Sequence, residues 1–213
     1  PDADHRRGRR AHPREAVAIR VAATLSAQCW LFAVGSSLFA LATAPGVPAW
    51  LGAGGANLLC FCGSWFFTTA AGIQLLRSDR ADRAEWSSAA VQFVGTVLFN
   101  VSTGASVLAH AVASERHYVW VPDVAGSTAF LLSGVLGVVA VGALIDLRSR
   151  DWWAAAVNMV GCVAFGVSAA AAFVRTTGVT EDERLANLGT FTGALCFLAA
   201  ALMLLPRQAA SRA

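Results

Sequence analysis

Residues 35–42 read Gly-Ser-Ser-Leu-Phe-Ala-Leu-Ala, and this stretch decides the fold because its pattern returns five more times along the chain. Each copy has a glycine, a phenylalanine four residues later, and an alanine or serine seven residues after the glycine. The pairs are Gly35 and Phe39, Gly63 and Phe67, Gly95 and Phe99, Gly126 and Phe130, Gly161 and Phe165, and Gly193 and Phe197. Positions four and seven residues apart lie on one face of a helix. The repeat therefore predicts six helices that present the same kind of face.

Each copy lies inside an apolar stretch of 20 or more residues. The stretches cover residues 20–44, 52–76, 87–112, 121–145, 153–174 and 186–205. At about 1.5 Å per residue, each helix is long enough to cross a hydrocarbon core of about 30 Å. The chain has 213 residues, of which 56% are hydrophobic and 14% charged, whereas soluble domains carry about 25% charged residues. The predicted fold class is an all-α, polytopic transmembrane bundle of six helices.

The arginines predict how the bundle is oriented. Residues 1–19 are polar and rich in arginine, and we expect a disordered tail there, a transmembrane domain over 20–205, and a second tail over 206–213. The two tails, Arg20 and the second and fourth loops hold 13 of the 16 arginines. Basic residues of short loops stay in the cytoplasm, so both termini are expected to be cytoplasmic.

The glycine and phenylalanine repeat has a physical meaning in lipid. Lipid gives helices no hydrophobic drive to associate, so close van der Waals contact through small residues must hold them together. We therefore interpret the twelve repeat residues as helix-packing residues. Similar junctions before Trp86 and Trp152 favour three repeated helical hairpins, while two inverted halves of three helices are the alternative.

Each span also has one amide or carboxylate in its N-terminal part. Alternate spans run in opposite directions, so these side chains should form two groups, one at each end of the bundle. Gln28, Gln92 and Asn158 form the first, and Asn57, Asp123 and Asn187 form the second. They either bond neighbouring helices or form polar rings at the two mouths of a central cavity.

The third span is the most polar, with Gln92, Thr96, Asn100, Thr103 and His110 at helical spacing along one stripe. Asn100 lies deep in the span, where an unpaired amide is costly. The stripe either contacts other helices or lines a cavity. The candidate cavity-lining residues are Gln92, Thr96, Asn100, Thr103, Asn57, Asp123, Asn158 and Asn187.

The chain has none of the short motifs that mark phosphate-binding loops, serine hydrolases, zinc proteases or dinucleotide-binding folds. His110, Glu115, His117 and Asp123 surround the third loop, but their spacing fits no compact metal motif. We predict no enzyme activity, no cofactor and no metal. No charged residue lies near the middle of a span, which argues against proton-coupled transport.

The stretches from Trp30 to Phe39 and from Asn57 to Phe67 contain Gly-Ser-x-x-Phe in an apolar setting. In this they resemble the YrhK-like family of membrane proteins, which has small two-helix domains and larger bacterial members with several. The resemblance implies a bacterial membrane protein without an assigned activity, and it carries over no catalytic residue.

These observations predict a multi-pass protein of the bacterial plasma membrane. Its role is expected to be structural or to lie in binding lipid or a partner, and the alternative is a small-solute channel or carrier lined by the third span. The predicted partners are membrane lipid and a second copy or another membrane protein, with no nucleic acid.

Overall fold

The computed structural model describes residues 13–108, 112–142, 145–175 and 177–206. Within them, six helices are long and apolar enough to cross a membrane. The long helices are α1 (Pro13–Thr43), α2 (Val47–Arg77), α3 (Arg83–Leu108), α5 (Val121–Ala140), α6 (Arg150–Ala171) and α7 (Glu183–Met203). A short α4 (Val112–Ser114) and a π-helix, η1 (Glu115–Trp120), precede α5. The predicted all-α transmembrane bundle is confirmed.

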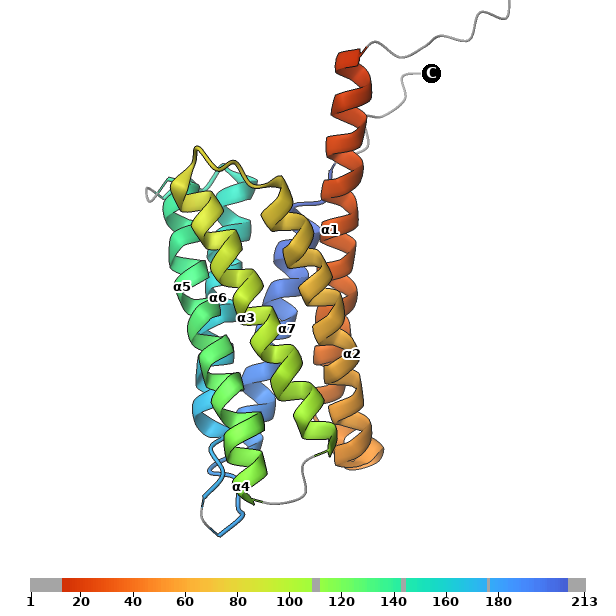
Figure 1. Cartoon of the computed structure of the whole chain (residues 1–213), viewed down its shortest axis with the longest axis vertical. Coiled ribbons are helices and arrows are strands. Elements are labelled where there is room, and N and C mark those ends of the chain that lie inside the picture. Colours follow the sequence, from red (N-terminus) through yellow and green to blue (C-terminus); the bar gives the residue numbers. More distant parts are fainter. Residues whose placement is uncertain (1–12, 109–111, 143–144, 176, 207–213) are drawn as a thin grey trace, which may run out of the picture.

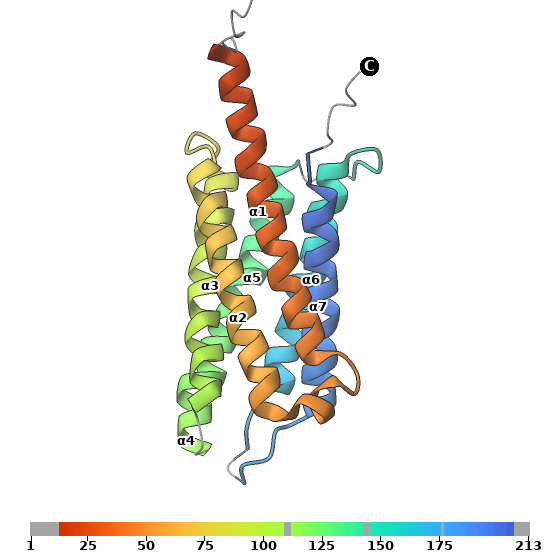
Figure 2. The same ribbon diagram turned by 90° about the vertical axis from the view of Figure 1, so that its right-hand side faces the viewer.

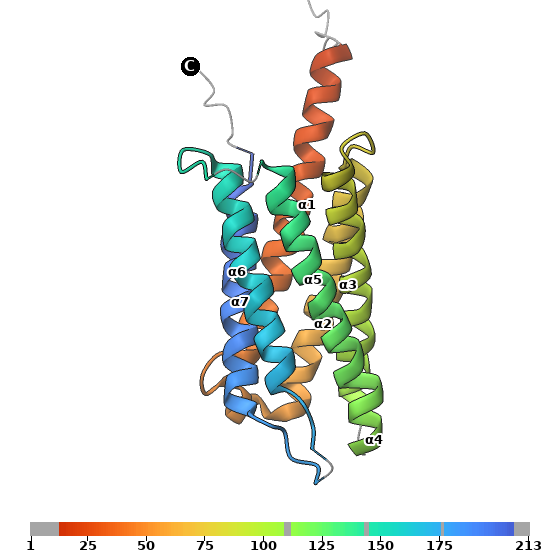
Figure 3. The same cartoon turned by 90° about the vertical axis from the view of Figure 1, so that its left-hand side faces the viewer.

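The six long helices stand side by side with alternating direction (Figure 1). Each packs against its two neighbours in the order α1, α2, α3, α5, α6, α7, and α7 packs against α1, so the helices form a closed ring. Figures 2 and 3 show this ring from two further sides. We call the end with the start of α1, the α2–α3 and α5–α6 connections and the end of α7 the N-terminal end, and the other end the distal end.

The first helix is longer than its apolar stretch. It begins at Pro13, so it includes residues 13–19, which were expected to belong to a disordered tail. Proline suits the first position of a helix because its missing N–H would have no partner there. The residues that follow, Arg14, Glu15 and Ala16, are good helix formers.

The fourth span is displaced toward the N-terminus relative to its expected range of 121–145. Pro122 cannot donate a backbone hydrogen bond, and the turn before it is widened, with the Val121 N–H donating to the Arg116 carbonyl. Helical structure therefore continues through residues 115–120, which were expected to form a loop. The span ends at Ala140 because Gly142 adopts a left-handed conformation with φ of 84°.

The repeat glycines lie where neighbouring helices come closest. A Cβ atom added to Gly35 would lie 2.7 Å from the Phe67 ring and 2.9 Å from the carbonyl oxygen of Gly63. A Cβ added to Gly63 would lie 3.0 Å from the Phe39 ring and 3.1 Å from the carbonyl oxygen of Gly35. The glycine of each helix thus contacts the phenylalanine ring of the other helix.

The same reciprocal contact joins α3 to α5 and α6 to α7. The contacts are Gly95 with Phe130, Gly126 with Phe99, Gly161 with Phe197, and Gly193 with Phe165. Three consecutive pairs of helices are therefore held by one packing arrangement, in which the absent side chains let the backbones approach and the aromatic rings fill the space beside them.

The outer surface of the ring is apolar and the helix interfaces are lined by small or hydroxylated residues. Trp65 and Val160 point outward with 55% and 56% of their surface exposed, whereas Ser36 and Ser64 are fully buried. A soluble protein has the opposite distribution. The surface is suited to contact with lipid.

Connections at the distal end are tied to the bundle. Trp120 in η1 donates from Nε1 to the Ala169 carbonyl at 3.0 Å, and the Arg116 guanidinium lies 4.9 Å from the centre of the Phe173 ring. In the α6–α7 connection, Val174 and Thr180 form an antiparallel bridge and Arg175 pairs with Glu181.

Candidate functional site: a cavity closed by phenylalanines

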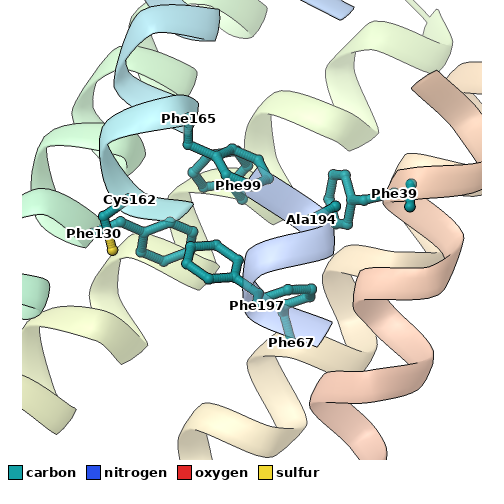
Figure 4. Close-up of a cluster of buried hydrophobic side chains, with 9 residues drawn as sticks. Phe39, Phe67, Phe99, Phe130, Cys162, Phe165, Ala194 and Phe197 are labelled. Carbon is teal, nitrogen blue, oxygen red and sulfur yellow. The ribbon is translucent and has the colours of Figure 1, made fainter. Parts of the chain in front are cut away.

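The phenylalanines of the repeat meet in the interior of the ring (Figure 4). We call them the phenylalanine cluster, and its members are Phe39, Phe67, Phe99, Phe130, Phe165 and Phe197, each at most 7% exposed. Phe99 and Phe130 stack with their ring centres 4.9 Å apart. Rings also touch between helix pairs, as Phe67 and Phe197 do at 5.9 Å. The cluster fills the middle of the ring with aromatic side chains.

A cavity of about 390 Å³ lies between the phenylalanine cluster and the N-terminal end. Its inner wall is formed by one repeat phenylalanine from each helix pair, namely Phe67, Phe130 and Phe197, and Phe32 of α1 also lines the cavity. Small residues such as Gly137 and Ala154 line its sides and leave the space open. The cavity is blind, because the cluster separates it from the distal half of the bundle.

Three amide side chains from alternate helices line the same cavity. They are Gln28 of α1, Gln92 of α3 and Asn158 of α6. The Gln28 Oε1 accepts from Arg77 Nη1 at 2.8 Å. The Gln92 Oε1 lies 3.3 Å from the Ser133 hydroxyl, whose single proton it shares with the closer Ser88 carbonyl. Within the described residues, neither glutamine NH₂ group has a hydrogen-bond partner, so both remain as donors.

Beside the cavity, α3 and α5 are joined by hydrogen bonds between two serines. Ser88 and Ser133 each donate to the other's backbone carbonyl at 2.9 Å. Both residues are buried and line the cavity. Serine in a membrane helix satisfies its hydroxyl on a neighbouring backbone in this manner, and the exchange fixes the two helices beside the cavity.

Acidic side chains surround the mouth of the cavity. Asp82, Glu85 and Asp151 line it, and all three are exposed. The Asp82 carboxylate also begins α3 by accepting hydrogen bonds from the backbone N–H groups of Ala84 and Glu85. The cavity thus changes from aromatic at its inner wall, through neutral and polar, to negatively charged at its mouth.

The other polar residues of the third span lie between helices. The Asn100 Nδ2 donates to the Thr68 hydroxyl of α2 at 2.7 Å, and the Thr103 hydroxyl donates to Ser64 of α2 at 3.1 Å. Thr96 is fully buried and bonds the Phe93 carbonyl of its own helix. Of the stripe Gln92, Thr96, Asn100 and Thr103, only Gln92 is among the lining residues of the cavity.

The second expected group of polar residues lies in the distal half of the bundle and does not line this cavity. Asn57 of α2 donates to the Ser106 carbonyl of α3 at 2.9 Å. Asp123 lies on α5 and Asn187 on α7. His110 falls outside the described residues, and within those described no group of three or more histidine, cysteine or acidic side chains could hold a metal.

Several lining residues were not among the expected cavity residues. Ser88 and Glu85 lie one and two helical turns before Gln92 on α3, so extending the polar stripe toward the N-terminus would have found them. Ser133 was interpreted only as the small residue of the repeat. Asp151 had no such signal, because an acidic residue in the first turn of a helix is common for reasons of helix stability.

No family model, curated protein or solved structure matches this chain.

Proposed function

We propose that this integral membrane protein binds a small apolar or amphiphilic molecule in the cavity at the N-terminal end. The observation that carries the proposal is the blind shape of the cavity, with Phe67, Phe130 and Phe197 at its inner wall and polar groups toward its mouth. Its volume of about 390 Å³ is in the range of small-molecule sites, about 300–1,000 Å³. A site that is apolar inside and polar at its mouth suits binding better than conduction.

The N-terminal end of the bundle is proposed to face the cytoplasm of a bacterial cell. Arg77, Arg80 and Arg83 lie at or beside the α2–α3 connection, and Arg148 and Arg150 at the α5–α6 connection. Basic residues in short connections favour the cytoplasmic side. In this orientation the ligand would enter from the cytoplasm or from the inner leaflet. Membership of the YrhK-like family stays a prediction.

The alternative, a channel or carrier lined by the third helix, has less in its favour. The Thr96 and Thr103 hydroxyls bond carbonyls of α3, and the Asn100 Nδ2 bonds Thr68 of α2. The Asn100 Oδ1 has no partner among the described residues, but it is buried between the helices. A continuous path along the ring axis would also require the phenylalanine cluster to separate. A binding role requires neither polar side chains of α3 that are free to line a path nor separation of the phenylalanine cluster.

Saturable binding of octanol to the full chain in phosphatidylcholine nanodiscs tests the proposal. Gly137→Leu should abolish it, because Gly137 lines the cavity and a Cβ there would meet only the Ser88 hydroxyl, at 3.4 Å. The matched control is Val135→Leu on the same helix, where the side chain points outward. Binding that is absent, or that is equal in both variants and the wild type, would overturn the proposal.

A further inference from the structure

The charged groups of the cavity narrow the class of molecule that it can hold. Among the described residues, the charged side chains that line it are Asp82, Glu85 and Asp151, and all three are acidic. Arginines also lie at this end of the bundle, but none of those described is among the lining residues; Arg77 is bound to the Gln28 amide oxygen and Arg150 to the Met203 carbonyl. The charges that line the mouth are therefore acidic, and they favour a positively charged group.

We infer that the ligand is an amphiphilic amine, with an apolar body against Phe67, Phe130 and Phe197 and a protonated amino group among Asp82, Glu85 and Asp151. This inference rests on the proposed function and adds the ligand's chemical class. The carboxylates and the three phenylalanines line one cavity, so a single molecule can contact both.

The amides between these two zones favour an oxygen atom on the ligand. The carbonyl oxygen of Gln28 is engaged by Arg77, and that of Gln92 shares the Ser133 proton with the Ser88 carbonyl. The NH₂ groups of both glutamines can donate to a hydroxyl, ether or carbonyl oxygen. An amino alcohol, or an amine that carries an amide or ester near its head, satisfies all three zones.

Other headgroups fit less well. A carboxylate or phosphate headgroup would meet three like charges at the mouth, and repulsion between like charges opposes binding. A neutral alcohol would satisfy the amides but would gain nothing from the carboxylates. A protonated amine gains from both the apolar inner wall and the charged mouth.

The test compares three probes of equal chain length, octylamine, octanol and octanoate, on the full chain in phosphatidylcholine nanodiscs at pH 7. A primary amine has a pKa of about 10.4 and is protonated under these conditions. We expect octylammonium to bind most tightly and octanoate least. Gly137→Leu should remove the binding of octylammonium and of octanol.

The charge is tested by the double variant Glu85→Gln/Asp151→Asn. Its dissociation constant for octylammonium should rise about 2- to 30-fold, since two exposed ion pairs contribute about 0.2–1 kcal/mol each. Octanol binding should not change. The matched control is Asp79→Asn/Asp146→Asn, which removes two carboxylates from the connections at the same end of the bundle without touching the cavity lining.

The possible failures are distinguishable. If octanol or octanoate binds as tightly as octylammonium, and Gly137→Leu removes that binding, the inferred amine class is wrong and the proposed binding function stands. Equal losses of octylammonium binding in the cavity and control double variants would also overturn the inference, because they would reflect surface charge alone. If no probe binds saturably, both proposals fail.

Discussion

Phe165 of α6 and Phe197 of α7 stack almost parallel, with ring centres 5.3 Å apart and an angle of 10° between their planes. Each ring also covers the glycine of the other helix, Phe197 covering Gly161 and Phe165 covering Gly193. Aromatic pairs of this kind contribute about 0.5–1.5 kcal/mol beyond the area they bury. One pair of side chains thus joins two helices and forms part of the barrier that closes the cavity.

The first prediction concerns the repeat glycines. Gly35→Ala should lower the thermal stability of the protein in detergent, because the new Cβ would lie 2.9 Å from the backbone oxygen of Gly63. Overpacking of this kind costs about 1–3 kcal/mol. Gly54→Ala is the control, since nothing lies within 4 Å of a Cβ added there. Equal tolerance at both positions would mean that Gly35 does not set the distance between α1 and α2.

The second prediction concerns the amide of the third span. Asn100→Ala and Thr68→Ala should each reduce stability by about 1 kcal/mol, because the Asn100 Nδ2 donates to the Thr68 hydroxyl at 2.7 Å. The double variant should cost less than the sum of the two, since both single changes remove one hydrogen bond. Unfolding in mixed micelles measures the difference, and strictly additive losses would contradict the bond.

The third prediction separates binding from conduction. Liposomes that contain the protein should take up glycerol no faster than empty liposomes, because the phenylalanine cluster fills the interior of the ring. Shrinkage and reswelling followed by light scattering measure the rate. If the protein raised the uptake rate above that of empty liposomes, and Asn100→Leu removed this increase, a path along the third helix would be supported instead.

The fourth prediction concerns orientation. In a background without the native cysteines, Val179→Cys at the distal end should react with an impermeant thiol reagent added outside intact cells. Ala81→Cys, at the N-terminal end, should react only after the membrane is opened. Both positions are exposed, so access alone decides the result. The reverse pattern would place the N-terminal end and its cavity outside the cell.

The fifth prediction concerns the connection between α6 and α7. Hydrogen bonds and charge attraction from Arg175 lower the pKa of the Glu181 carboxyl below its ordinary value. A lowered pKa means that the pair stabilises the connection at pH values above the ordinary pKa of glutamate, and that this contribution is lost as the pH falls through the lowered value. Carbon NMR of the labelled carboxyl should show the lowered pKa, and Arg175→Gln should return it to normal. An ordinary pKa in the wild type would contradict the ion pair.

Much of the architecture is readable from sequence alone because lipid imposes simple rules. An apolar stretch of about 20 residues must be helical, since every backbone group needs an internal partner in lipid. The glycine and phenylalanine spacing also predicted which face of each helix meets a neighbour. Two helix backbones come close where a side chain is absent, as at Gly35 and Gly63. The ends of helices were less predictable, because a single residue such as Pro122 or Gly142 moves them.

The site depended on tertiary structure. The repeat places a phenylalanine on each helix, but only closure of the ring from α1 to α7 brings the six rings together and leaves a cavity on one side of them. Helical spacing puts Gln92 and Asn100 on one stripe of α3. In the folded ring Asn100 meets Thr68 of α2, whereas Gln92 lies in the cavity. Spacing along a helix determines which side chains share a face. The arrangement of the neighbouring helices determines what each of those side chains contacts along the helix axis.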